Sequence, residues 1–179
     1  MLSYAITDPS TLHFDSLQED IKRFSNNADM ILYRDKQNSN YHEYAKVFVQ
    51  AAKVYPFDKI LLHNDITLAV DLAVDGVHLS SKNIEKIPFA KTNGLFVIFS
   101  AHTLQEAQKA ENLGADMITY SPIFSTPGKG YPVGLEKLKE IASLVNIPVI
   151  ALGGILTGEQ IKACEDAGAK GFASIRYFK

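Results

Sequence analysis

The sequence predicts an α/β protein in which eight strands close into a (β/α)8 (TIM) barrel. Eight short apolar runs alternate with stretches of helical periodicity. Several runs are apolar at every position, which is typical of strands covered on both faces. An open doubly wound sheet is the alternative, but no early glycine-rich dinucleotide loop is present. The expected strands are residues 3–7, 29–34, 59–63, 76–80, 95–100, 116–120, 148–152 and 171–175.

Helical patterns lie between the strands, and the clearest cover residues 41–55 and 134–145. Two further helices begin with capping boxes, in which a threonine and a residue three positions later satisfy each other's backbone N–H groups. The boxes are Thr103 with Glu106 and Thr157 with Gln160. No linker or low-complexity segment divides the chain, so we expect a single domain, residues 1–179.

The expected barrel is shortened, because 179 residues are fewer than such barrels usually contain. The segment 81–93 is too short and proline-broken for a full fourth helix, and only residues 176–179 follow the eighth strand. The fourth helix is therefore expected to be reduced and the eighth missing. We expect the flank to be covered by a second copy of the chain in a homodimer, or by Tyr177 and Phe178.

The composition is that of an ordinary globular protein, with 46% hydrophobic and 21% charged residues. A net charge of -2 argues against nucleic-acid binding, which needs a basic stripe. There is no apolar run that could span a membrane and no secretory pattern at the N-terminus. The single cysteine, Cys164, excludes an intrachain disulfide. We therefore expect a cytoplasmic enzyme without thiol-metal sites.

Two loops should lie at the carboxyl ends of the strands, where barrels of this class place their chemistry. The first, "SPIFSTPGKGYPVG" (121–134), supplies glycine amides, the Thr126 hydroxyl and the Lys129 ammonium, a combination that suits phosphate or pyrophosphate. The second contains Gly153 and Gly154 and could cradle an anion. The structural alternatives are a rigid surface turn and a tight turn that requires glycine.

Further polar residues end other strands. Arg34 and Lys36 could bind phosphate oxygens or form salt bridges at the mouth. Asn64 and Asp65 could hold a polar ring or a metal, although Asp65 would also cap a helix well. Ser100 ends the fifth strand.

Six segments, in order, resemble the motifs of the thiamine phosphate synthase/TenI family and cover nearly the whole chain. They are "YRDK", "HNDITLAVDLAVDGVHL", "SAHTLQEA", "GADMITYSPIFSTPGKG", "GLEKLKEIASLVNIPVIALGGI" and "AGAKGFASI". The resemblance implies a (β/α)8 barrel and one of two activities. The synthase joins hydroxymethylpyrimidine pyrophosphate to thiazole phosphate with the help of Mg²⁺. The TenI branch shifts a proton on a carboxythiazole phosphate with a general base and no metal.

The resemblance also implies roles for individual residues. Arg34 and Lys36 match a basic pair facing pyrophosphate, Asn64 a pyrimidine contact, and Asp65 a magnesium carboxylate. The remaining matches are Ser100 for the hydroxyl in "SAHT", Thr126 and Lys129 for the loop that closes on the phosphates, and Gly153 and Gly154 for the thiazole phosphate site.

Several positions depart from the synthase pattern. Lys82 and Asn83 stand where two acidic residues normally follow the fourth strand, and a neutral amide is a poorer ligand for Mg²⁺. Tyr33 is expected to replace a glutamine that helps hold the pyrimidine. Arg176 replaces a serine at the phosphate and could bind it bidentately. Pro122 stands where TenI proteins have their histidine base.

We therefore expect a TenI-like thiazole tautomerase that binds thiazole phosphate, with His63 as the replacement base and Lys129 as a second catalytic residue. His78 and His102 are the other candidate bases, since an imidazole titrates near neutral pH. The alternatives are a thiamine phosphate synthase and a non-catalytic thiazole-phosphate binding or regulatory protein. No cofactor is expected, except Mg²⁺ at Asp65 if the chain acts as a synthase.

Overall fold

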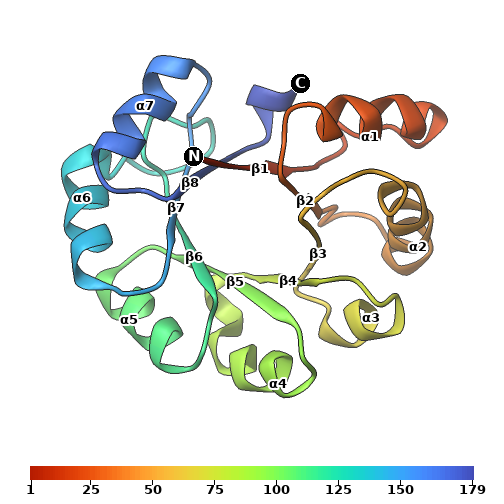
Figure 1. Cartoon of the computed structure of the whole chain (residues 1–179), viewed down its shortest axis with the longest axis horizontal. Coiled ribbons are helices and arrows are strands. Elements are labelled where there is room, and N and C mark those ends of the chain that lie inside the picture. The colour runs from red at the N-terminus through yellow and green to blue at the C-terminus, as the bar shows by residue number, and fades with distance from the viewer.

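The computed structural model describes residues 1–179 and contains a closed barrel of eight parallel strands, in which β8 pairs with β1 (Figure 1). The strands are β1 (Leu2–Ile6), β2 (Met30–Tyr33), β3 (Lys59–His63), β4 (Gly76–Leu79), β5 (Phe96–Ala101), β6 (Met117–Tyr120), β7 (Val149–Leu152) and β8 (Gly171–Ser174). Every predicted strand is present, and its ends agree to within one residue. The predicted fold class is confirmed.

Helices surround the barrel on its outside (Figure 1). They are α1 (Leu17–Ser25), α2 (Tyr41–Ala52), α3 (Ile66–Asp71), α4 (Ile87–Thr92), α5 (Leu104–Asn112), α6 (Gly134–Leu144) and α7 (Gly158–Asp166), with 3-10 segments η1 (Phe14–Ser16), η2 (Ser81–Lys86) and η3 (Arg176–Phe178). Both capping boxes form as predicted: Thr103 accepts from the backbone N–H of Glu106, and Thr157 from that of Gln160. None of these helices has the length and apolar character that a membrane span requires.

The fourth helix is reduced and no eighth α-helix is present, as predicted. Between β4 and β5 the chain forms only η2 and the short α4, which has Pro88 in its first turn. After β8 only η3 follows. Phe178 in η3 is 4% exposed and stacks on Phe172 of β8, with 5.8 Å between ring centroids, and Arg23 of α1 donates to the Phe178 carbonyl oxygen. The C-terminal residues thus cover part of the flank themselves, while the homodimer stays a prediction.

Side chains of each strand alternate between the barrel interior and the layer beneath the helices, because successive residues point to opposite faces. In β2, Leu32 belongs to the interior cluster and Tyr33 to the outer one. The Tyr33 ring stacks between Tyr41 and Phe48 of α2, at centroid distances of 5.0 and 5.1 Å. Every second residue of a strand therefore faces the barrel interior.

The interior contains a buried chain of polar side chains. The Tyr4 hydroxyl lies 3.1 Å from His78 Nδ1, and His78 Nε2 lies 2.9 Å from Ser100 Oγ. Tyr4 is fully buried and its hydroxyl has no other partner, so it donates to Nδ1, and Nε2–H then donates to Ser100. Burial, reinforced by the neighbouring His63 and Arg34, lowers the pKa of His78 to about 3. Because Ser100 Oγ accepts from His78, the Ser100 hydroxyl proton stays free to donate at a cavity that Ser100 lines.

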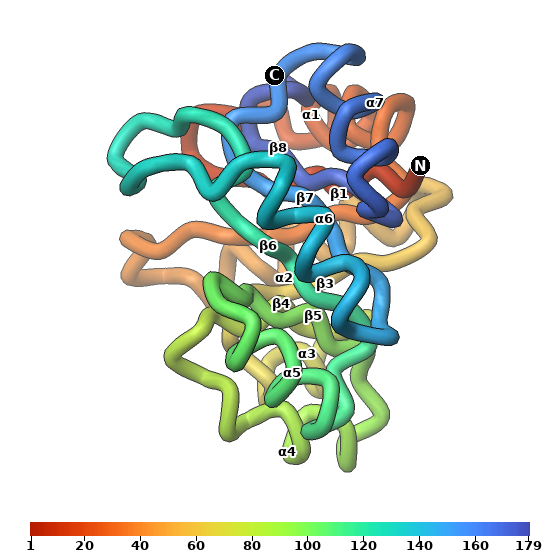
Figure 2. Tube along the Cα trace, turned by 90° about the vertical axis from the view of Figure 1, so that its left-hand side faces the viewer, coloured from red at the N-terminus to blue at the C-terminus, as the bar shows by residue number.

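The carboxyl ends of all eight strands meet at one face of the barrel, as a closed parallel sheet requires. Figure 2 shows the loop 121–133 projecting from this face, on the same side as the segment that follows β2. The base of that loop is fixed by two backbone hydrogen bonds, from Val133 to Pro122 and from Gly134 to Ile123. The two loops predicted to bind anions therefore share one face, which we call the mouth.

We expect Phe178→Ala to lower the free energy of unfolding by about 3 kcal/mol, the low end for removing a buried phenylalanine, because the residue lies at the edge of the core. Urea denaturation measures the change. Tyr177→Ala is the matched control, because Tyr177 is 39% exposed and should cost far less. Equal losses in the two variants would contradict the packing role of Phe178.

We expect stability to fall as the pH drops from about 6.5 toward about 4, the window between ordinary and native histidine pKa values. Burial lowers the pKa of His63 to about 4 and that of His78 to about 3. In this window the unfolded chain binds protons that the folded chain does not, so acidification favours unfolding. Thermal melts across the window measure the slope, and His78→Gln should flatten it. A slope unchanged by that substitution would contradict the assignment.

Candidate functional site

Two adjoining cavities open at the mouth. The central cavity, of about 190 Å³, lies over the barrel interior and is lined among others by Arg34, His63, Ser100, His102 and Lys129. The glycine cavity, of about 260 Å³, lies between the ends of β7 and β8. Both cavities are bordered by Thr126 and Gly153, so one elongated ligand can reach from the first into the second. A wider outer groove of about 700 Å³ lies on the same face beside α3 and shares Lys36 and His63 with the central cavity.

The glycine cavity has the features of an anion site. Gly153 and Gly154 have φ values of 102° and 70°, and a Cβ at Gly154 would lie 2.6 Å from the Ser125 carbonyl oxygen. Both positions therefore require glycine, because the two mouth loops touch here; Phe124 N–H also donates to the Gly153 carbonyl oxygen. Neither glycine N–H has an acceptor within the protein. Two unpaired backbone donors facing a cavity are what a phosphate oxygen needs.

Three side chains predicted for the phosphate also reach these cavities. Arg176 borders the glycine cavity, Lys129 borders the central one, and Thr126 borders both. The Thr126 hydroxyl donates its one proton to the Phe124 carbonyl oxygen at 3.0 Å, so it would have to turn away from Phe124 to donate to a phosphate oxygen. Asp8 also borders the glycine cavity, but its carboxylate accepts from the backbone and hydroxyl of Ser10.

Cationic side chains gather at the central cavity. Arg34, Lys36 and Lys129 line it, and none of them forms an ion pair. Burial lowers the pKa of Lys36, and repulsion by Arg34, Lys129 and Lys82 lowers it further. The salt bridges that were the structural alternative for Arg34 and Lys36 are therefore absent, and the cavity carries uncompensated positive charge.

His63, expected as the general base, is held with its lone pair occupied. The Asn64 side-chain oxygen accepts from Ser80 N–H at 2.8 Å, so its NH₂ group faces His63 Nε2 at 3.0 Å. Nε2 is therefore an acceptor, and the proton sits on Nδ1, which is buried without a partner. Burial and the cations Arg34 and Lys36 lower the pKa of His63 to about 4. This geometry suits a hydrogen-bond donor better than a base.

His102 has the opposite arrangement. Its Nδ1 lies 3.0 Å from the Ser121 carbonyl oxygen, which can only accept. Nδ1 therefore carries the proton, and Nε2 keeps its lone pair. His102 lines the central cavity together with Ser121 and Pro122. It is the histidine of the mouth whose tautomer is set for accepting a proton.

Asn64 and Asp65 lie in the outer groove and not in the central cavity. Asp65 Oδ1 caps α3 by accepting from Leu68 N–H at 2.9 Å, and Oδ2 pairs with His42 Nε2 at 2.8 Å. Asn83 donates to the Ser80 hydroxyl at 3.0 Å. No cluster of three His, Cys, Asp or Glu side chains is placed to hold a metal. With both Asp65 oxygens engaged and lysines nearby, these residues do not fit a magnesium ion held by two carboxylates.

The position opposite the pyrimidine also differs from expectation. Tyr33 was expected to replace the glutamine, but it points outward beneath α2, whereas Leu32 lines the central cavity. The expectation placed the cavity-facing residue one position too late in the strand, and a shift of one residue moves a side chain to the other face of the sheet. An apolar Leu32 offers no hydrogen bond to a pyrimidine edge.

The sequence named Ser100, His78 and His102 as candidates but could not rank the histidines. The motif "SAHT" contains both Ser100 and His102, but only tertiary structure brings Ser121 to His102 and His78 to Ser100. A useful signal was present, because a histidine that follows a barrel strand lies at the catalytic face.

Comparisons with known proteins agree with this geometry. The profile of the family described as thiamine monophosphate synthase matches residues 3–178. A relative from Aquifex aeolicus named "Putative thiamine-phosphate synthase 2" is 40% identical, over 98% of this chain and 96% of the relative. The "Thiamine-phosphate synthase" of Syntrophomonas wolfei is 32% identical, over 96% of this chain and 85% of that protein.

A solved structure gives the same result. The structure titled thiamine phosphate pyrophosphorylase from Pyrococcus furiosus superposes with a TM-score of 0.83 at 28% identity, covering 97% of this chain and 85% of its own. Sequence and fold agree over nearly the whole barrel, and the chain belongs to the thiamine monophosphate synthase family.

Proposed function

We propose that this chain is a TenI-like isomerase that moves a proton on a carboxythiazole phosphate. The observation that carries the proposal is His102, an imidazole held with its acceptor nitrogen free at the wall of a cavity that continues into an anion site. The family membership places the chain in thiamine biosynthesis, where such a substrate occurs.

The phosphate end of the substrate would bind in the glycine cavity. The unpaired N–H groups of Gly153 and Gly154 donate to phosphate oxygens, and Arg176 adds a charge-assisted contact. The ring then extends into the central cavity, which shares Thr126 with the glycine cavity. Binding one end firmly orients the ring for proton transfer and lowers the entropic part of the barrier.

The proton transfer follows from the side chains around the ring. His102 Nε2 accepts the proton from the saturated ring carbon, and its Nδ1–H remains on the Ser121 carbonyl, which orients the imidazole. The electron pair enters the ring, and the proton is returned elsewhere on the same molecule, so the product is an isomer. The Ser100 hydroxyl, oriented by His78, donates to an acceptor on the substrate while charge builds up. Lys129 supports the negative charge from the loop side.

The pyrimidine side of the mouth supports this choice over pyrimidine transfer. The apolar Leu32 lines the central cavity and offers no hydrogen bond to a pyrimidine. The side-chain amide of Asn64 is already hydrogen-bonded to His63 and to Ser80. Both carboxylate oxygens of Asp65 accept hydrogen bonds within the protein, one from His42 and one from the Leu68 N–H.

Thiamine phosphate synthase is the second candidate, because the relatives reported above carry that name. It would require Mg²⁺ from solution or from the substrate pyrophosphate. A non-catalytic thiazole-phosphate binding protein is the third candidate, since a cradle for phosphate serves binding as well as turnover.

Purified protein should convert the carboxythiazole phosphate tautomer to the aromatic isomer in EDTA, followed by the rise in ultraviolet absorbance of the aromatic ring. The same protein with hydroxymethylpyrimidine pyrophosphate, thiazole phosphate and Mg²⁺ should yield no thiamine phosphate. Formation of thiamine phosphate would instead establish the second candidate. Binding of thiazole phosphate with neither product formed would establish the third.

His102→Asn should lower kcat for isomerisation by about 10²-fold or more, the usual contribution of a positioned base, and leave KM within about threefold. His63→Gln should have a smaller effect on kcat, because the lone pair of His63 is occupied. His13→Asn, which changes a histidine paired with Asp20 on α1, is the control. A loss of kcat with His63→Gln and none with His102→Asn would restore His63 as the base.

A further inference from the structure

We propose that a cationic cluster at the mouth binds the second anionic group of the substrate directly, without a divalent cation. The cluster comprises Arg34, Lys36, Lys82 and Lys129. The inference rests on the proposed function, because the carboxylate of carboxythiazole phosphate is then the group that the cluster binds.

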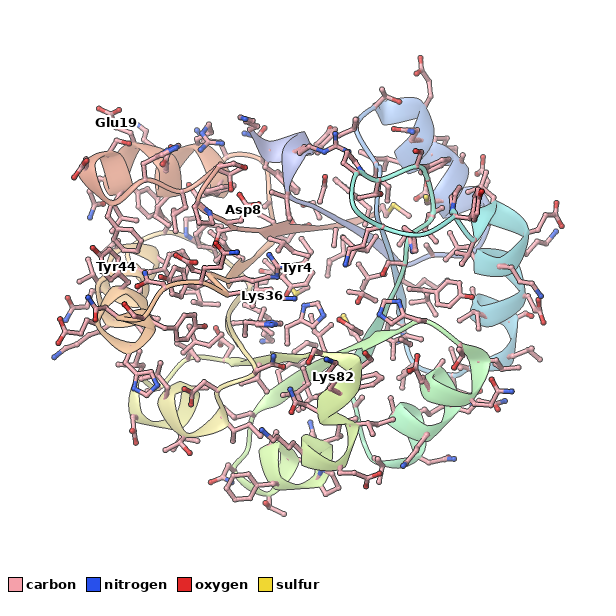
Figure 3. The ribbon with its side chains drawn as sticks, turned by 180° about the vertical axis from the view of Figure 1, so that it is seen from behind. Tyr4, Asp8, Glu19, Lys36, Tyr44 and Lys82 are labelled. Carbon is pink, nitrogen blue, oxygen red and sulfur yellow. The ribbon has the colours of Figure 1, made fainter.

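The cluster is a site of unbalanced charge. Arg34, Lys36 and Lys129 line the central cavity, and Figure 3 shows Lys36 over the barrel and Lys82 on the adjoining η2 segment of the same face. None of the four forms an ion pair, although Asp8 and Asp35 are close enough to Arg34 to raise its pKa against the lowering by burial. A half-buried guanidinium with no carboxylate partner gains most from an anionic ligand.

Mutual repulsion supports the same conclusion. The pKa of Lys36 is lowered first by burial and then by Arg34, Lys129 and Lys82. An oxyanion that binds among these like charges reduces their mutual repulsion, and this reduction contributes to the binding free energy.

Lys82 brings a positive charge close enough to Lys36 to lower the pKa of Lys36, from the segment where the family pattern has acidic residues. The acidic pair of the family pattern is Lys82 and Asn83 here, Asn83 donates to Ser80, and Asp65 is engaged by Leu68 and His42. The positive charge on this side of the mouth therefore comes from an ammonium group, and the remaining carboxylate, Asp65, is engaged within the protein.

The two anion sites also match one ligand. Arg34, Lys36 and Lys129 of the cluster border the central cavity, and Gly153 and Gly154 border the glycine cavity, which adjoins it at Thr126. A small ring carrying a phosphate at one end and a carboxylate at the other can occupy both sites together.

Calorimetric titration with inorganic pyrophosphate tests the inference. In EDTA, binding should be detectable, and adding Mg²⁺ should not tighten it, because Mg²⁺ complexes pyrophosphate in solution and competes with the cationic cluster for the anion. Lys82→Ala should weaken binding about two- to fivefold, as expected for an exposed charge pair, and Lys46→Ala on α2 should not. Binding that requires Mg²⁺, or equal effects of the two alanine variants, would overturn the inference.

A charge-reversal variant provides the opposite test. The double substitution Lys82→Asp and Asn83→Asp should abolish pyrophosphate binding in EDTA and restore part of it when Mg²⁺ is added. Unchanged binding of this variant in EDTA, with a normal circular dichroism spectrum, would show that Lys82 does not face the ligand.

The identity of the bound group is settled separately. Carboxythiazole phosphate should bind the wild type more tightly than the thiazole phosphate that lacks the carboxylate, and Lys82→Ala should reduce the difference by about two- to fivefold. If the two bind equally while pyrophosphate still binds in EDTA beside saturating thiazole phosphate, the metal-free cluster stands and the proposed isomerase fails.

Discussion

Closure of the eight-stranded parallel barrel is the constraint on which the rest of the molecule depends. Because every strand runs in the same direction, the residues that follow each strand are gathered at one face, however far apart they lie in the sequence. Arg34 after β2, His102 after β5 and Gly153 after β7 thereby border one cavity. The reduced fourth and eighth helices do not disturb this arrangement, since η2 still reaches the mouth and Phe178 covers the outer face of β8.

The histidines of the mouth differ in their electrostatic surroundings and in their hydrogen-bond partners. Burial, together with the nearby cations Arg34 and Lys36, lowers the pKa of His63 to about 4 and that of His78 to about 3. Both therefore stay neutral and act through hydrogen bonds. His102 differs from both, because the Ser121 carbonyl on the neighbouring loop holds the proton on Nδ1 and leaves Nε2 as an acceptor.

The two loops that we predict to bind anions are in direct contact with each other. The glycines after β7 pack directly on Pro122–Ser125, and Phe124 N–H bonds to the Gly153 carbonyl oxygen. The structural and functional explanations of these glycines are thus compatible: close packing demands the absence of a Cβ, and both glycines line the cavity with N–H groups that have no acceptor in the protein.

The sequence by itself determined the strands, the capping boxes, the shortened barrel and the two glycine-containing mouth loops, because each depends on local periodicity or on conformations that few residues adopt. Only the tertiary structure decided that Leu32 and not Tyr33 faces the cavity, that Asp65 is engaged by His42, and which nitrogen of each mouth histidine is free. Those properties depend on partners such as Asn64 with Ser80 and His102 with Ser121, which lie on different barrel segments and meet only when the sheet closes.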